Sequence, residues 1–86
     1  MTDSTLTTKV DSGRQVIDSI DGTIIRLVRE RQQAAAGVQQ ARVDAGEPRL
    51  HNAREISVLK RYSGELGKPG TALASAILTS CRGPRA

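Results

Sequence analysis

Residues 12–45 read SGRQVIDSIDGTIIRLVRERQQAAAGVQQARVDA, a run without proline in which the good helix formers Glu, Gln, Arg, Ala and Leu are frequent. Apolar side chains recur in this run at steps of three and four, the spacing that gathers them onto one face of a helix. They are Ile17, Ile20, Ile24, Leu27 or Val28, Ala35 and Val38. We therefore predict one continuous helix over residues 12–45.

Three arginines interrupt or extend the apolar face of this helix. Arg31 and Arg42 lie eleven residues apart, close to three turns, so they project from nearly the same side. Arg14 extends the same row one turn before Ile17. A charge that is removed from water needs a compensating partner. Guanidinium groups on the apolar face therefore indicate a pocket that binds an anion.

The length of the chain favours an assembly of two copies. With 86 residues, 37% of them apolar and neither Phe nor Trp, the chain forms one domain with a thin core. The predicted helix would be about 50 Å long at 1.5 Å per residue, whereas a compact domain of this size is roughly 30 Å across. A second chain that covers the overhanging apolar face is the simplest remedy, so we expect a homodimer.

Charge and composition restrict the classes of function. The net charge of +4 suits an anionic ligand and also nucleic acid or a membrane surface. Nucleic acid is disfavoured because Tyr62 is the sole aromatic residue and the basic residues are dispersed. No run approaches the ~20 apolar residues of a membrane span, and the first ten residues lack the apolar core of a secretory signal. We expect no contact with nucleic acid or membrane.

The remaining composition points to a cytoplasmic protein without a metal. The single cysteine, Cys81, excludes an internal disulfide and is compatible with a reducing cytoplasm. His51 and Cys81 have no companions at the spacing of metal ligands.

The rest of the chain predicts two shorter helices, and hence an all-α fold. Gly46 and Pro48 end the long helix. Asn52, followed by Glu55 three residues later, has the pattern of a capping box that begins a second helix, which runs to about residue 63. A glycine-rich break follows, and then a third helix over residues 71–82. We divide the chain into a flexible tail (1–10), a helical domain (11–83) and a short C-terminal tail (84–86).

In this order, several short motifs resemble those of the AroQ-type, all-helical chorismate mutases, in particular the short actinobacterial kind. The motifs are R-x-x-I-D-x-I-D from Arg14, I-x-x-L-V-x-x-R ending at Arg31, then Arg42, R-L-H-N-A-R-E at 49–55 and R-Y-S at 61–63. The resemblance covers roughly residues 13–83.

The resemblance implies a fold, a reaction and partners. The fold is an intertwined homodimer of chorismate mutase type II, in which each of two active sites is completed by the other chain. The reaction is the Claisen rearrangement of chorismate to prephenate in the shikimate pathway, which leads to aromatic amino acids and needs no cofactor. The implied partners are chorismate and, as a candidate activating complex, the first enzyme of that pathway, DAHP synthase.

The resemblance also assigns roles at the reacting centre. Arg31 from the same chain and Arg14 from the other chain correspond to arginines that grip substrate carboxylates. Arg42 corresponds to the cation that reaches the ether oxygen and a carboxylate, and Glu55 to the group that hydrogen-bonds the ring hydroxyl. We take Arg31, Arg42 and Glu55 as the candidate catalytic residues.

Three further residues border the implied site. Arg54 corresponds to a residue that orients the carboxylate side, and His51 to a position near the ring hydroxyl. Arg82 aligns with an arginine that borders the pocket. Many members also present a glutamine or glutamate from the last helix to the ether oxygen, but residues 77–82 here read ILTSCR and contain neither.

Other interpretations stay open at this point. An isochorismate-pyruvate lyase or a mutase of 4-amino-4-deoxychorismate would use the same fold and arginines, and a non-catalytic helical adaptor would use them to bind a partner. Glu55 is also explained by a capping box alone, and His51 by a solvated loop. Lys60 and Arg61 fit a solvated helix face, and Cys81 a small buried side chain.

Overall fold

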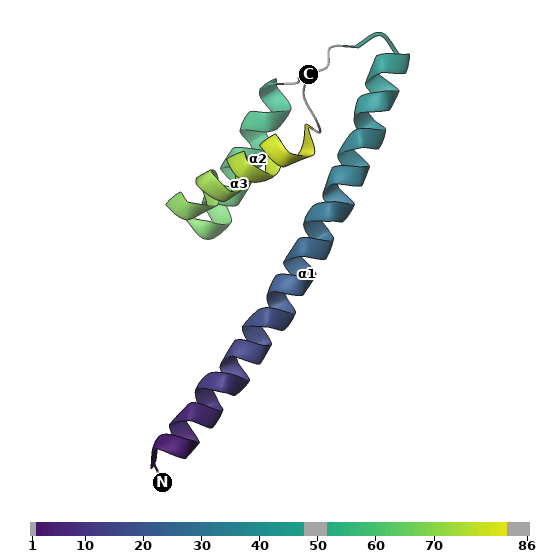
Figure 1. Ribbon diagram of the computed structural model, residues 1–86. Coiled ribbons are helices and arrows are strands. Elements are labelled where there is room, and N and C mark those ends of the chain that lie inside the picture. Colours follow the sequence, from purple (N-terminus) through teal and green to yellow (C-terminus); the bar gives the residue numbers. More distant parts are fainter. Residues whose placement is uncertain (1, 48–51, 83–86) are drawn as a thin grey trace.

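The computed structural model describes residues 2–47 and 52–82, and nothing in these ranges is a strand. Three helices follow one another: α1 (Thr2–Asp44), α2 (Asn52–Leu66) and α3 (Lys68–Cys81). Figure 1 shows α2 and α3 beside the C-terminal half of α1, while its N-terminal half projects alone. The predicted all-α architecture of one long and two short helices is confirmed.

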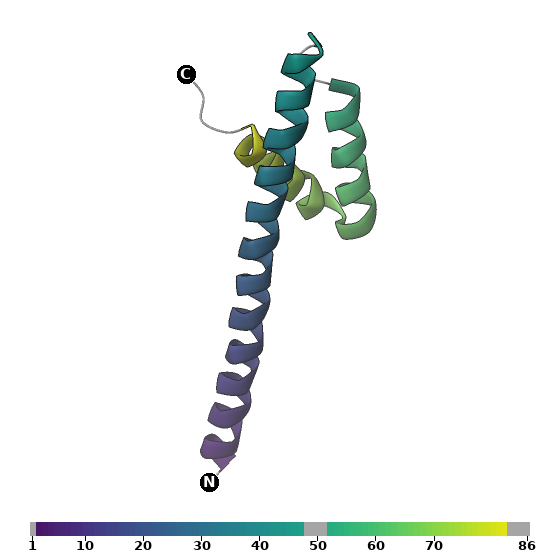
Figure 2. The same ribbon diagram turned by 90° about the vertical axis from the view of Figure 1, so that its right-hand side faces the viewer.

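The length of α1 sets the shape of the molecule. Its 43 residues span about 65 Å at 1.5 Å per residue, nearly the whole 67 Å long axis of the chain. The radius of gyration is 18.5 Å, whereas a compact domain of this length has a radius near 12 Å. Figure 2 shows the same elongated form from the side. A single copy is therefore far from globular.

The helix begins ten residues earlier than we predicted, at Thr2 instead of Ser12. Leu6 and Val10 explain the difference, because they continue the apolar row before Ile17 at helical spacing. Extending an existing helix also avoids the cost of nucleation, so the threonines of this segment are carried along despite their modest propensity. Residues 2–10 thus extend α1, and the division of the chain into tails and domain stays a prediction.

The C-terminus of α1 was predicted correctly and has a defined stop. Gly46 adopts the left-handed conformation, with φ 73°. The Gly46 amide donates to the Val43 carbonyl oxygen at 3.1 Å, and the Glu47 amide donates to the Arg42 carbonyl oxygen at 2.8 Å. These are the two hydrogen bonds of a Schellman motif, which satisfies the last carbonyl groups of a helix.

The break between α2 and α3 is shorter than the predicted one. We expected an irregular segment from Gly64 to Gly70, but α2 continues to Leu66 and α3 begins at Lys68. Gly67 alone, with φ 74°, turns the chain. Gly64 remains helical, and Pro69 falls in the first turn of α3, where the missing amide hydrogen is tolerated.

Packing within one chain centres on α3. This helix contacts both α1 and α2, and no such contact joins α1 to α2 within the described residues. Among them, Ala74 on α3 and Val58 on α2 are the only buried apolar side chains. Large apolar side chains are instead about half exposed: Leu6, Val10, Val16, Ile17, Ile20, Ile24, Ile25, Leu27, Val38, Val43, Ile56, Leu66 and Leu73.

The two halves of α1 have different surroundings. In the C-terminal half, Val28, Ala35 and Arg42 are partly buried, and α1 packs against α3. In the N-terminal half, which projects alone in Figure 1, Ile20 and Ile24 are 53% and 50% exposed. Ile24 lies about five turns before Arg42 and thus on the same side of the helix. The apolar row therefore extends beyond the rest of a single chain, as the length of the helix predicted.

Gly70 is the residue that lets α2 and α3 approach. A β-carbon on it would collide with the carbonyl group of Tyr62 and lie 2.9 Å from Cβ of Leu66. We expect Gly70→Ala to lower the free energy of unfolding by about 2 kcal/mol or more, since backbone has to move. Gly64→Ala is the matched control, because nothing lies within 4 Å of its added β-carbon, and it should be neutral or stabilising. Urea unfolding measures both, and equal effects would contradict the role of Gly70.

Candidate active site

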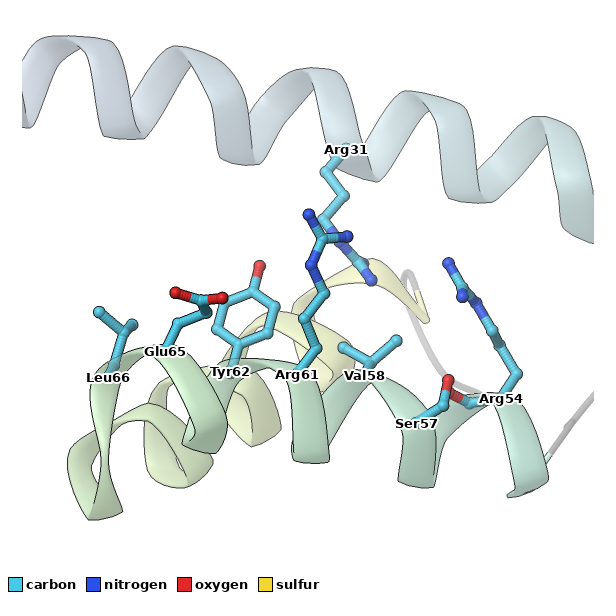
Figure 3. Close-up of a pocket in the computed structure, with 8 residues that line it drawn as sticks. All are labelled: Arg31, Arg54, Ser57, Val58, Arg61, Tyr62, Glu65 and Leu66. Carbon is cyan, nitrogen blue, oxygen red and sulfur yellow. The ribbon is translucent and has the colours of Figure 1, made fainter.

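A pocket of about 410 Å³ opens between α1 and α2. Arg31 is its lining residue from α1, and the others come from α2: Arg54, Ser57, Val58, Arg61, Tyr62, Glu65 and Leu66. The α2 residues follow Arg54 at steps of three and four, so they form one face of that helix. Figure 3 shows this face opposite the Arg31 side chain.

Arg31 reaches the pocket from α1 and is held from α3. Its Nη1 atom donates a hydrogen bond to Sγ of Cys81, 3.0 Å away and partly buried. In Figure 3 the Arg31 side chain extends from α1 toward α2, and its guanidinium lies in the space between these helices. The planar fork suits a carboxylate, which it can bind through two parallel hydrogen bonds.

Glu55 and Arg82 connect the start of α2 to the end of α3. Nη2 of Arg82 donates to Oε1 of Glu55 at 2.6 Å, and the two side chains are 37% and 24% exposed. Glu55 directly follows Arg54, the first residue of the pocket face, and is not itself a lining residue. Its carboxylate therefore pairs with α3 in this structure, in addition to any role at the helix start.

The other predicted residues of α1 lie outside the pocket of a single chain. Arg42 is partly buried in the last turn of α1 and is not a lining residue. Arg14 is exposed and lies 17 residues before Arg31, or about 25 Å along the helix axis. No arginine side chain spans that distance, so Arg14 cannot serve the pocket of its own chain.

His51 falls outside the described residues. We interpreted Arg61 as part of a solvated face, but it lines the pocket. Tyr62 and Glu65 also line it and were not predicted as site residues. The spacing from Arg54 contained the necessary signal: residues seven, eight and eleven positions later return to the same side of a helix.

The pocket lining is strongly basic. Arg31, Arg54 and Arg61 contribute three positive charges and Glu65 one negative charge, a net charge of +2. No group of three or more His, Cys, Asp or Glu that could hold a metal ion occurs in residues 2–47 and 52–82. Over the same ranges, no helix combines the length and hydropathy of a bilayer span. The described groups can bind and orient an anion.

A small helical protein with an arginine-lined pocket for an anion is the class that this fold and site define. Comparisons with known proteins specify the family. The family described as chorismate mutase type II matches residues 13–78. The chain is 39% identical over 75 residues to the "Intracellular chorismate mutase" of Mycobacterium tuberculosis, which covers 87% of this chain and 70% of that protein. The protein of the same name from Mycolicibacterium smegmatis is 36% identical over 87% of this chain and 72% of its own length.

A solved structure resembles the whole arrangement of helices. It is the complex of DAHP synthase and chorismate mutase from Corynebacterium glutamicum with a bound transition state analog. The match has a TM-score of 0.86 and 26% identity, and it covers 92% of this chain and 95% of that one. The chain therefore belongs to the chorismate mutase type II family.

The Arg82–Glu55 ion pair should couple α2 to α3 measurably. Because both side chains are partly shielded from water, we expect a coupling energy of about 0.5–1 kcal/mol. A double-mutant cycle of Arg82→Ala and Glu55→Gln in urea unfolding, at one protein concentration, measures it. The exposed pair of Arg26 and Glu30, 3.3 Å apart within α1, is the control and should give a smaller value. A coupling energy of zero between Arg82 and Glu55 would contradict the contact.

Proposed function

We propose that this chain is a chorismate mutase, which rearranges chorismate to prephenate in a site built from two copies of the chain. The observation that carries the proposal is the pocket where Arg31 from α1 faces Arg54 from α2, in a member of the chorismate mutase type II family. A net lining charge of +2 complements a substrate with two carboxylates.

The reaction is within the means of these residues. The rearrangement breaks one C–O bond and forms one C–C bond within a single molecule, so it calls for neither a nucleophile nor a proton transfer. Holding the substrate in its reactive conformation can supply several kcal/mol of the barrier. A fixed cation at the ether oxygen, where negative charge develops, can contribute roughly 3 kcal/mol more. Both effects need rigid, well-placed cations.

Each predicted residue has a proposed part in this scheme. Arg31 and Arg54 bind the substrate carboxylates from opposite walls of the pocket. Arg42 supplies the cation at the ether oxygen, and Glu55, oriented by Arg82, accepts the hydrogen bond of the ring hydroxyl. His51 keeps its proposed place near that hydroxyl and lies outside the described residues.

Arg14 completes the site from a second copy. Its distance of about 25 Å along α1 from Arg31 excludes a role in its own pocket. The half-exposed apolar face of α1, with Ile17, Ile20, Ile24 and Leu27 at alternating steps of three and four, supports a homodimer in which the α1 helices pack along each other. Such packing would carry Arg14 to the other chain's pocket and cover the apolar face.

Two further expectations rest on the relatives. The Corynebacterium glutamicum protein forms a complex with DAHP synthase, which supports an enzyme of that kind as a partner of this chain. The mycobacterial relatives are named intracellular, which supports our prediction of a cytoplasmic location. An isochorismate-pyruvate lyase, a mutase of 4-amino-4-deoxychorismate and a non-catalytic adaptor are the alternatives.

Turnover of purified protein distinguishes these functions. The protein is mixed in turn with chorismate, isochorismate and 4-amino-4-deoxychorismate, and the loss of substrate absorbance is followed in the ultraviolet. Prephenate from chorismate supports the proposal, while pyruvate from isochorismate alone would assign the lyase. Turnover of 4-amino-4-deoxychorismate alone would identify the chain as a mutase of that compound. No turnover of any of the three compounds would favour the non-catalytic adaptor.

Arginine substitutions should separate catalysis from folding. Arg31→Ala should nearly abolish turnover while the dimer stays folded, because a charge in the pocket stabilises the transition state more than the fold. Arg42→Gln should lose most of kcat, by about 100-fold or more, and Arg42→Lys should keep part of it because it keeps the charge. Steady-state kinetics and circular dichroism measure these effects. Normal turnover by the Arg42→Gln variant would contradict the proposed role of Arg42 at the ether oxygen.

The exposed face of α1 should hold the dimer together. We expect Ile20→Glu to raise the Kd of dimerisation by at least about 100-fold, since each copy would bury an unpaired carboxylate in the interface. Gln15→Glu adds the same charge on the opposite side of α1 and should leave the Kd nearly unchanged. Analytical ultracentrifugation over a range of concentrations measures both variants. A wild-type monomer, or equal effects of the two substitutions, would contradict this interface.

A further inference from the structure

Arg61 is a charged pocket residue to which the proposed mechanism gives no part. It lies on the same face of α2 as Arg54, seven residues later, and lines the pocket together with Arg31. Figure 3 shows the Arg61 side chain rising from α2 toward α1, with its guanidinium turned to the space that the Arg31 guanidinium also enters. Two cations thus approach one space from opposite walls.

No carboxylate neutralises Arg61 within the described residues. Glu65 lies four residues later, at the spacing that allows an ion pair on a helix, yet the two described ion pairs of the chain are Arg26–Glu30 and Arg82–Glu55. Arg26 and Glu30 show that an arginine and a glutamate at this same spacing do pair in this structure. In Figure 3 the Glu65 carboxylate lies beside the ring of Tyr62, and the Arg61 side chain extends toward α1.

An anion between the two walls would relieve the repulsion. Like charges in a partly enclosed pocket raise the free energy of the empty site, and a ligand carboxylate that reaches both guanidiniums removes that cost on binding. Without Arg61, the lining would carry a net charge of +1 instead of +2. The charge of Arg61 is therefore part of the match between this pocket and a doubly negative ligand.

We propose that Arg61 is a further substrate-binding residue, which holds from α2 the carboxylate that Arg31 holds from α1. This inference rests on the proposed function and adds a residue to its site. Arg61 is exposed, and its proposed role is to bind the dianion, while Arg42 remains the proposed cation at the ether oxygen. Loss of Arg61 should therefore raise KM more than it lowers kcat.

Lys60 provides a matched control. It is the preceding residue, is also exposed and positive, and does not line the pocket. We expect Arg61→Ala to raise the KM for chorismate, and the Kd for prephenate measured by calorimetry, by about ten-fold, the effect of losing one charge-assisted hydrogen bond. Lys60→Ala should change neither by more than about two-fold. Arg61→Lys should recover part of the loss, and kcat should stay within about three-fold in all variants.

Dimerisation is measured for the same variants by analytical ultracentrifugation. An unchanged KM and Kd for Arg61→Ala would overturn the proposal, as would equal shifts for Arg61→Ala and Lys60→Ala, which would indicate a general field effect. A weaker dimer for Arg61→Ala alone, with normal KM once the dimer is saturated, would assign Arg61 to the interface and would also overturn it. A wild-type protein that neither turns over chorismate nor binds prephenate would instead refute the proposed function itself.

Discussion

The guanidinium groups on the two walls of the pocket repel one another, and the whole arrangement depends on holding them there. Arg31 on α1 faces Arg54 and Arg61 on α2 across about 410 Å³. α3 supplies the rigidity, since Cys81 accepts a hydrogen bond from Arg31 at 3.0 Å and Arg82 pairs with Glu55 at 2.6 Å. The close approach of α2 and α3 at Gly70 fixes the position of these anchors. Cations fixed before the ligand arrives need no reorganisation when it binds, which is how such groups lower a barrier.

The same chain leaves the site incomplete. The C-terminal half of α1 lies beside α3 (Figure 1), whereas the apolar side chains of its N-terminal half, from Leu6 to Leu27, are about half exposed. Within residues 2–47 and 52–82, Val58 and Ala74 are the only buried apolar side chains, so a single chain has no core large enough to cover a 43-residue helix. Dimerisation would meet two needs at once, because burying the exposed face stabilises the fold and the same packing brings Arg14 to a second pocket. Stability and catalysis would then share one interface.

The sequence was sufficient for much of this structure. Periodicity predicted α1. Gly46, with Pro48 two residues later, predicted its end, because glycine suits the left-handed position after a helix and proline cannot continue one. The start of α1 was predicted too late, because a threonine-rich segment has only a weak intrinsic preference for the helical state. Such a segment becomes helical when it extends a helix that has already formed. The break after α2 was predicted too long, since glycine and proline both occur at helix ends and only the backbone shows that Gly67 alone turns.

The site was predictable in part. The family resemblance indicated Arg31 and Arg54, which both line the pocket. The resemblance included Arg61 in its R-Y-S motif but assigned it no role, although the helical spacing from Arg54 places it on the same face. The pairing of Glu55 with Arg82, and of Arg31 with Cys81, joins residues 27 and 50 positions apart. Contacts of that kind depend on how helices pack, which local sequence patterns do not specify.

Mixing two inactive variants tests the shared site most directly. Arg14→Ala and Arg31→Ala homodimers are combined in equal amounts and allowed to exchange subunits, and turnover of chorismate is measured. If Arg14 acts in the other chain's pocket, each mixed dimer has one intact site, and random exchange restores about a quarter of the wild-type activity. If Arg14 served its own chain, every site would keep a substitution. Activity no higher than that of the separate variants, with mixed dimers present, would contradict the account.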